Sequence, residues 1–336
     1  MTTNRQITLA ARPQGLPQDS DFQLVESPIP EPGDGQFLVQ CEYLSVDPYM
    51  RGRMNDAKSY AEPVKIGEVM GGECVGKVLK SHHPKFAEGS YVAGMFGWQE
   101  YALSDGSGGV RPLDPDAAPV STALHVLGMP GMTAYFGLFD VCKAKPGDTV
   151  FVTGAAGAVG SVVGQLAKIK GCKVYGTAGT DQKIQYMTGL GYDGGFNYKS
   201  CEHPVRDIGQ LCPDGVDCFF DNTGGPISDA VFPLLNVHAH VAICGQISMY
   251  NATEMPTGPR LLGHLIVKRA TVQGLLVTDF AEKYRQATGD LVRWYGEGKL
   301  QCQERITDGI ENAPAAFIEM LQGANTGKQL VRLSSG

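Results

Sequence analysis

The chain of 336 residues lacks the features that mark several large protein classes. It has no apolar run near the roughly 18 residues that a membrane-spanning helix needs, and its N-terminus has no apolar signal core. Charged residues make up only 19% of the chain, and the formal net charge is −7. Such a chain has no general attraction for nucleic acid or for an anionic membrane. We therefore expect a cytoplasmic protein with no nucleic-acid or membrane partner.

The nine cysteines form no C-x-x-C pair, the spacing that many zinc and redox sites use. Cys172, Cys218 and Cys244 lie in apolar runs typical of strands. Reduced thiols inside the fold are therefore favoured over a disulfide framework or a zinc cluster. His238 and His240 are two residues apart but have no third ligand of a suitable type, so we expect no metal.

Glycine, in contrast, is abundant, with 44 residues, and 43% of the chain is hydrophobic. This composition is typical of a globular chain with many tight turns. Because 336 residues exceed what one hydrophobic core usually serves, two domains are expected. The first 120 or so residues are predicted to be β-rich. Short strands are predicted at 37–46, 71–80 and 91–101, and the prolines at 28, 30 and 32 mark the loop before the first of them.

From residue 149 onward, strands alternate with helices. Repeated βα units with short connections predict a doubly wound parallel sheet. A long helix is predicted at 280–297, and a final strand at 327–333 is expected to return to the first domain. The other predicted strands are 149–153, 172–177, 218–222, 240–244 and 270–277, and the helices are 158–170, 181–189, 203–211 and 226–236.

The segment from Thr149 to Lys168 predicts a dinucleotide site. A buried strand is followed by a glycine-rich turn and by an amphipathic helix. Gly157 lets the backbone approach a phosphate, and Gly160 lets the helix lie close to the strand. The N–H groups at the start of the helix then face the pyrophosphate.

The second strand of this region ends without the acidic residue that binds the ribose hydroxyls of NAD. It ends in Gly176-Thr-Ala-Gly-Thr, and the first acidic residue is Asp181. Small residues leave room for a 2′-phosphate, which Lys183 and the hydroxyl of Tyr198 can bind. A solvated helix-face lysine is the alternative interpretation of Lys183. Because the acidic residue is missing, NADP(H) is the favoured cofactor.

Five motifs occur in the order expected of one known family. They are 47–54, 128–135, 157–165, 220–225 and 244–251. Together they resemble the zinc-independent medium-chain dehydrogenases/reductases of the leukotriene B4 dehydrogenase / prostaglandin reductase type. The segments Met50-Arg-Gly-Arg-Met and Tyr250-Asn-Ala-Thr-Glu are most similar to those of its bacterial NADPH-dependent curcumin reductases. The resemblance covers almost the whole chain.

This resemblance implies an α/β chain of two domains, a GroES-like β-rich catalytic domain (1–125 and 300–336) and a Rossmann NADP-binding domain (126–299). Members reduce the carbon–carbon double bond of an α,β-unsaturated ketone or aldehyde with NADPH, and are commonly homodimers. The cofactor-binding residues that it implies are Thr133, Gly157, Ala158, Val159, Gly160, Gly179, Lys183, Tyr198, Asn222, Cys244, Gly245, Tyr250 and Asn325.

Zinc-dependent relatives carry Gly-His-Glu where this chain has Gly67-Glu-Val-Met-Gly-Gly, so another group must stabilise the enolate that forms when hydride reaches the β-carbon. A tyrosine hydroxyl can donate a hydrogen bond or the proton. Tyr250 follows the fifth strand, at the sheet edge where ligands bind, and Tyr60 lies in a loop of the first domain. These two are the predicted catalytic residues, and a packing role is the alternative for each. Tyr49, Arg51 and Met249 are predicted to bind the enone substrate.

Two other functions stay open at this stage. Proteins of this fold also reduce quinones, and some relatives use bound NADPH for interaction rather than for catalysis. A curcumin-like diarylheptanoid is one candidate substrate. The loops at 55–63 and 253–263 differ most among relatives, and they leave the substrate open.

Overall fold

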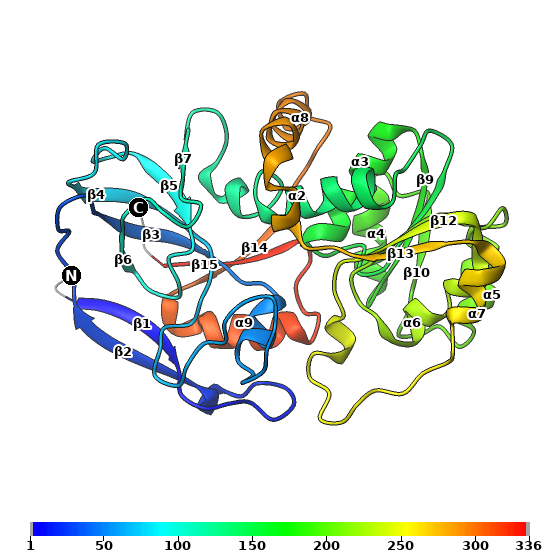
Figure 1. The fold of residues 1–336 in the computed structure, drawn as a ribbon, viewed down its shortest axis with the longest axis horizontal. Coiled ribbons are helices and arrows are strands. Elements are labelled where there is room, and N and C mark those ends of the chain that lie inside the picture. Colours follow the sequence, from blue (N-terminus) through cyan, green and yellow to red (C-terminus); the bar gives the residue numbers. More distant parts are fainter. Residues whose placement is uncertain (1–2, 334–336) are drawn as a thin grey trace. The chain divides into compact units, whose positions relative to one another are not determined.

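The computed structural model describes residues 3–333, which fold into two compact units. The first unit combines the chain up to Leu124 with the part from Glu304 onward, and the second spans His125–Gln303 (Figure 1). Among the described residues, no helix is both long enough and apolar enough to pass through a bilayer.

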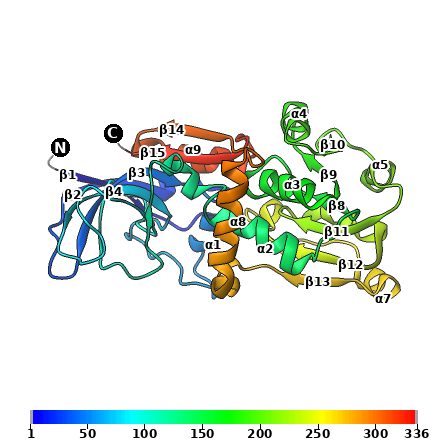
Figure 2. The ribbon, with the colours of Figure 1, turned by 90° about the horizontal axis from the view of Figure 1, so that it is seen from above.

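The second unit is built on a six-stranded parallel sheet. Its strands are β8 (Thr149–Val152), β9 (Lys173–Ala178), β10 (Gly194–Asn197), β11 (Val216–Asp221), β12 (Leu235–Ile243) and β13 (Thr271–Gly274). Figure 2 shows them in the order β10-β9-β8-β11-β12-β13. This is the strand order of the Rossmann fold, so the predicted doubly wound sheet is confirmed.

Helices cover both faces of this sheet, because successive residues of a buried strand point to opposite sides. Val150 packs in the cluster that contains Val162, whereas its neighbour Phe151 packs in the cluster that contains Ile208. The helices are α2 (Met129–Phe136), α3 (Ala158–Lys170), α4 (Asp181–Gly189), α5 (Pro204–Leu211), α6 (Gly225–Asp229), α7 (Leu262–Lys268) and α8 (Tyr284–Gly296).

Two helices of this unit are shorter than the sequence predicted. The helix predicted at 226–236 ends at Asp229, a 3₁₀ turn covers Phe232–Leu234, and strand β12 begins at Leu235. Pro233 has no N–H for a continuing helix, which explains the break. The helix predicted at 280–297 begins at Tyr284, because Phe280 has non-helical angles (φ −105°, ψ 16°) and stacks on Phe136.

The first unit holds a seven-stranded sheet and a separate β-hairpin-like pair. Its elements are β1 (Thr3–Leu9), β2 (Phe22–Pro28), β3 (Phe37–Ser45), α1 (Tyr49–Arg53), β4 (Cys74–Ser81), β5 (Tyr91–Gly94), β6 (Tyr101–Ser104), β7 (Arg111–Leu113), β14 (Glu304–Asp308), α9 (Ala313–Leu321) and β15 (Lys328–Arg332). The tail strand β15, red in Figure 1, pairs antiparallel with β3, so its predicted return to the first domain is confirmed.

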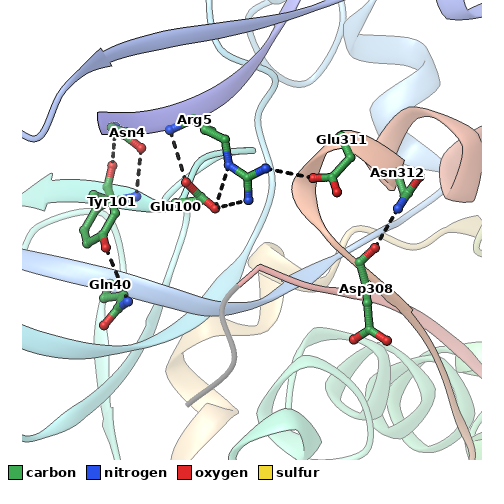
Figure 3. Close-up of polar contacts among 8 residues, drawn as sticks. All are labelled: Asn4, Arg5, Gln40, Glu100, Tyr101, Asp308, Glu311 and Asn312. Carbon is green, nitrogen blue, oxygen red and sulfur yellow. Dashed lines mark hydrogen bonds and ion pairs between the residues drawn. The ribbon is translucent and has the colours of Figure 1, made fainter. Parts of the chain in front are cut away.

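The strands β1 and β2 precede the proline-rich loop, so the prediction that this loop comes before the first strand was wrong. The polar side chains of β1 do not give the pattern of a buried strand. Figure 3 shows the residues, distant in the sequence, with which they form hydrogen bonds. Asn4 donates to the carbonyl of Tyr101 (2.9 Å) and accepts from its N–H (3.0 Å). Arg5 donates through Nη2 to buried Glu100 (2.6 Å) and through Nη1 to Glu311 (3.1 Å).

Candidate active site

The glycine-rich turn connects β8 to α3 and ends at Gly157, which caps the helix with extended angles (φ −83°, ψ 179°). A Cβ on Gly160 would lie 2.3 Å from the Gly154 carbonyl oxygen, so only glycine lets the first helical turn approach the strand end. Within the described residues no side chain caps this helix. Its first N–H groups, at Ala158 and Val159, are therefore suited to an anion such as a pyrophosphate.

The end of β9 has the small residues that a 2′-phosphate requires. After Ala178 come Gly179 and Thr180, whose hydroxyl accepts from the Lys183 N–H (3.2 Å) and caps α4. The Tyr198 hydroxyl lies only 3.2 Å from the position of a Cβ on Gly179. The structure thus brings Gly179 and Tyr198 together beside the helical turn that carries Lys183.

The first acidic residue after this strand end is Asp181, and its carboxylate bonds to the end of β10. The Asp181 carboxylate accepts a hydrogen bond from the Asn197 amide (3.0 Å). Lys199, which the sequence analysis missed, places its Cε 3.3 Å from the Cβ position of Gly179. The one sequence feature that pointed to Lys199 as a phosphate-binding residue was its position next to Tyr198. That is weak evidence, because lysines are common on any exposed turn. The strand end therefore has the Lys199 side chain within reach.

Three strand ends meet at the carboxyl edge of the sheet. The Asn222 side chain donates to the Thr153 carbonyl (2.8 Å), which joins the end of β11 to the end of β8. The N–H groups of Cys244 and Gly245 donate to the Asp221 carbonyl (2.8 and 3.1 Å), which joins β12 to β11. Burial raises the pKa of the Cys244 thiol to about 12, so the thiol is protonated at neutral pH.

Tyr250 turns back toward this edge through the 3₁₀ turn Ile247–Met249. Its hydroxyl accepts from the Gln246 N–H (3.3 Å) and lies 3.5 Å from the position of a Cβ on Gly245. Met249 lines an adjoining cavity of about 840 Å³ whose other walls include Phe232 and Asp229. Four predicted residues, Asn222, Cys244, Gly245 and Tyr250, thus gather at one place.

Two predicted cofactor residues lie apart from this cluster in the sequence. The Thr133 hydroxyl donates to the Met129 carbonyl (2.8 Å) within α2. Asn325, in the first unit just before β15, donates to the Gly327 carbonyl (2.8 Å). Their roles in cofactor binding stay predictions.

In the first unit, the guanidinium of Arg53, at the end of α1, lies against the rings of both Tyr49 and Tyr60. The Arg53 carbon Cζ lies 4.8 Å from the centroid of the Tyr60 ring and 5.8 Å from that of Tyr49. The Tyr49 hydroxyl is buried and has no hydrogen-bond partner within residues 3–333. Burial, with the Asp47 and Glu73 carboxylates adding to it, raises the pKa of Tyr49 well above its usual value. Tyr49 is thus a protonated donor that lacks an acceptor.

Arg51 is almost completely buried and donates to the Gly15 carbonyl (2.9 Å) and to the Asn55 amide oxygen (2.6 Å). Burial lowers the pKa of its guanidinium. These bonds hold an N-terminal segment against α1. Its predicted contact with substrate stays a prediction.

A buried ion pair fixes the start of α1, and the sequence analysis missed it. Lys328 of β15 donates to Asp47 Oδ1 (2.7 Å) and to the Val46 carbonyl (2.8 Å), while Ser45 donates to Asp47 Oδ2. The two charged side chains are 1% and 7% exposed. Asp47 stands two residues before Tyr49, so this pair holds the backbone just before that tyrosine.

Comparison with known proteins gives matches over both units. A family model described as the N-terminal domain of oxidoreductase matches residues 5–111, and one described as zinc-binding dehydrogenase matches 158–293. The chain is 46% identical to the putative NADP-dependent oxidoreductase YfmJ of Bacillus subtilis, over 99% of this chain and 98% of that protein. It is 43% identical to the NADPH-dependent curcumin reductase of Escherichia coli, over 98% and 97%. Prostaglandin reductase 1 of Mus musculus is 44% identical, over 97% and 98%.

Among solved structures, CurA from Vibrio vulnificus in complex with NADPH matches with a TM-score of 0.94 at 45% identity, covering 99% of this chain and 100% of that one. The predicted fold class, a GroES-like β-rich domain with a Rossmann domain, is confirmed by this match. The name of the second family model mentions zinc, but residues 67–72 carry no histidine. The chain belongs to the zinc-independent medium-chain dehydrogenases/reductases of the leukotriene B4 dehydrogenase / prostaglandin reductase type.

Proposed function

We propose that this oxidoreductase uses NADPH to reduce the carbon–carbon double bond of an α,β-unsaturated ketone or aldehyde, with curcumin-like compounds among its substrates. The observation that carries the choice of NADPH is the end of β9, where the Tyr198 hydroxyl lies beside Gly179, Thr180 caps the helical turn of Lys183, and the Asp181 carboxylate accepts from Asn197. Relatives over 40% identical are named as a curcumin reductase and a prostaglandin reductase. The two compact units correspond, in this proposal, to the catalytic domain and the cofactor-binding domain.

When bound, NADPH supplies the hydride, and the chain binds and orients the reactants. The N–H groups at the start of α3 bind the pyrophosphate, and Lys183, Tyr198 and Lys199 bind the 2′-phosphate. Gly245 lets the chain lie close to the end of β11 beside Tyr250, because a Cβ there would lie 3.0 Å from the Asn222 carbonyl oxygen.

Tyr250 donates the proton, or orders the water that does. Its oxygen accepts the Gln246 N–H, and such a bond stabilises the phenolate that remains after proton transfer. The buried hydroxyl of Tyr49 donates a hydrogen bond to the substrate oxygen, which gives it the acceptor that it lacks. Tyr60, which is 60% exposed, is the second candidate for proton donation.

The test is a comparison of substrates with the loss of NADPH absorbance as the measurement. We expect oxidation with aliphatic enones and with curcumin, and little with naphthoquinone. Faster turnover of the quinone would favour quinone reduction by the same fold. Tight NADPH binding without oxidation across the set of enones would contradict the proposal and favour a non-catalytic role.

Replacement of Lys183 by alanine should weaken NADPH binding about 10- to 100-fold, the range for a lost hydrogen bond to a charged group. NADH binding should change little, because NADH has no 2′-phosphate. Dissociation constants from titration of both cofactors measure the effect. Gln182→Ala alters the same helical turn without removing a cation and serves as the control. Equal weakening of both cofactors in Lys183→Ala would contradict the assignment.

A homodimer also belongs to this proposal, and the edge strand β13 supports it. All four residues of β13 are exposed, and within residues 3–333 it pairs with β12 alone. The preceding helix α7 exposes Leu262, Ile266 and Val267. Pairing of two such edges about a two-fold axis covers both the unpaired backbone and the apolar side chains.

The Ile266→Glu substitution should convert the dimer to monomer, because it places one charge of the same sign on each copy at the contact. The mass in solution by light scattering is the measurement. Val205→Glu places the same charge on α5, at another exposed valine, and should leave the dimer intact. If Ile266→Glu remains a dimer, the dimer contact does not involve this part of α7.

A further inference from the structure

The Asp221 carboxylate, at the end of β11, is fully buried and has no assigned role. Its oxygens accept five hydrogen bonds. Oδ1 accepts from the Thr153 hydroxyl (2.7 Å) and from the N–H groups of Thr223 (3.1 Å) and Gly224 (3.0 Å), and Oδ2 accepts from the Ser228 hydroxyl (2.6 Å) and the Gln246 amide (3.0 Å). All five donors are neutral, so the fold surrounds a carboxylate with oriented dipoles.

Two of these donors belong to segments that the proposed function uses. Thr153 opens the glycine-rich turn, and its hydroxyl also accepts from the Asn222 N–H (2.9 Å). Gln246 lies on the loop after β12, and its own N–H donates to the Tyr250 hydroxyl. A continuous series of hydrogen bonds therefore leads from the phosphate-binding turn through Asp221 to Tyr250.

The same loop is held at a second point. Ser248 donates to the Thr223 carbonyl through both its N–H (3.0 Å) and its hydroxyl (2.6 Å). Gly224 has a left-handed conformation (φ 66°), and a Cβ there would lie 2.2 Å from Gln246 Oε1. The side chain of Gln246 thus fills space that only a glycine leaves, which fixes the direction of its amide toward Asp221.

We propose that Asp221 is a positioning residue that acts through Gln246 to hold residues 244–250, and with them the Tyr250 hydroxyl, in register with the glycine-rich turn. The inference rests on the proposed function, because it takes Tyr250 to act on the substrate. A carboxylate suits this place better than an amide, since it accepts at both oxygens and every neighbour donates.

Asp221→Asn tests the proposal, because the amide has the same shape but turns an N–H₂ group toward donors in either orientation. We expect kcat to fall at least about tenfold, because here the penalty of an unsatisfied buried donor falls on the arrangement of the loop that holds Tyr250. In a Tyr250→Phe background the same substitution should have almost no further effect, because residues that act as a unit give non-additive losses. Losses that multiply in the double variant would overturn the proposal.

Asp217→Asn is the matched control. Asp217 lies in the same strand and accepts two hydrogen bonds, from the Thr149 N–H and the Asn236 amide (2.8 Å each), but it lies nearer the other end of β11. It should lower stability without lowering kcat. Gln246→Met, which removes one donor and leaves the carboxylate with four, replaces Asp221→Asn if that variant does not fold.

Amide hydrogen exchange gives a readout that does not depend on turnover. Exchange at residues 244–250 should accelerate in Asp221→Asn and stay unchanged in Asp217→Asn. If the wild-type protein reduces no enone, the proposed function fails, and exchange alone still decides whether Asp221 holds the loop. If the wild-type protein is active and exchange of the loop does not change, only the positioning role is overturned.

Discussion

Tyr250→Phe should lower kcat for an enone about 100- to 10,000-fold, the usual contribution of a positioned proton donor. The NADPH dissociation constant should change little, because the substitution keeps the aromatic ring of this predicted cofactor-binding residue and removes only the hydroxyl that accepts from the Gln246 N–H. Steady-state kinetics with saturating NADPH, together with a cofactor titration, measure the two effects. Tyr198→Phe provides the opposite pattern as a control, with weaker NADPH binding and little change in kcat.

Unaltered turnover in Tyr250→Phe would remove this residue from the mechanism. The next experiments would then be Tyr49→Phe and Tyr60→Phe. The first removes the buried hydroxyl without an acceptor, and the second removes the exposed one beside Arg53. A loss confined to KM in Tyr49→Phe would fit substrate binding, whereas a loss confined to kcat would indicate proton donation.

Lys328→Met should destabilise the protein by about 3–5 kcal/mol, because it leaves the buried Asp47 carboxylate without its cation. The midpoint of urea unfolding, followed by circular dichroism, measures the loss. Arg332→Met, on the same strand, breaks an ion pair with Asp308 whose side chains are 40% and 75% exposed, and should cost less than about 1 kcal/mol.

The double variant Lys328→Met with Asp47→Leu should recover much of the lost stability, because it removes the uncompensated charge as well. Equal unfolding midpoints for Lys328→Met and Arg332→Met would contradict the assignment of the pair as a buried one. A lowered kcat in Lys328→Met at temperatures where the variant stays folded would show that the pair also positions α1.

The sequence predicted most reliably the elements whose signal is local. Helix α3 begins and ends where its glycines and apolar spacing place it, and α4 follows Thr180, a good capping residue. Strand β1 was missed because Asn4 and Arg5 look like surface residues until their partners at Glu100 and Tyr101, about a hundred positions away, are known. The burial of a polar side chain depends on partners that a local pattern does not contain.

The residues of the candidate site follow the same rule: those with a local sequence pattern could be predicted, and those without one could not. Gly157 and Gly160 could be predicted as site residues because a glycine-rich turn between a strand and a helix is typical of a dinucleotide site, and Lys183 because the preceding strand ends without an acidic residue. Lys199, Arg53 and Lys328 were missed, because a lysine or arginine is as common on a solvated surface as in a site. Asp221 was present in the Phe220–Gly225 motif, but only its five donors, drawn from four segments, show what it does.

The hydrogen bonds between Ser248 and Thr223 anchor the first part of the loop after β12, so for protein engineering this loop can be treated as two parts. Ser248 joins the first part of this loop to the segment after β11, whereas the part from residue 251 to 261 carries the highly exposed Met255. A graft that exchanges residues 251–261 with those of a relative, and keeps 244–250, should therefore transfer substrate preference while Tyr250, the proposed proton donor, stays in register. Substrate range can vary among natural relatives in the same way, because the first part of this loop is constrained by its hydrogen bonds and the second part is not constrained by them.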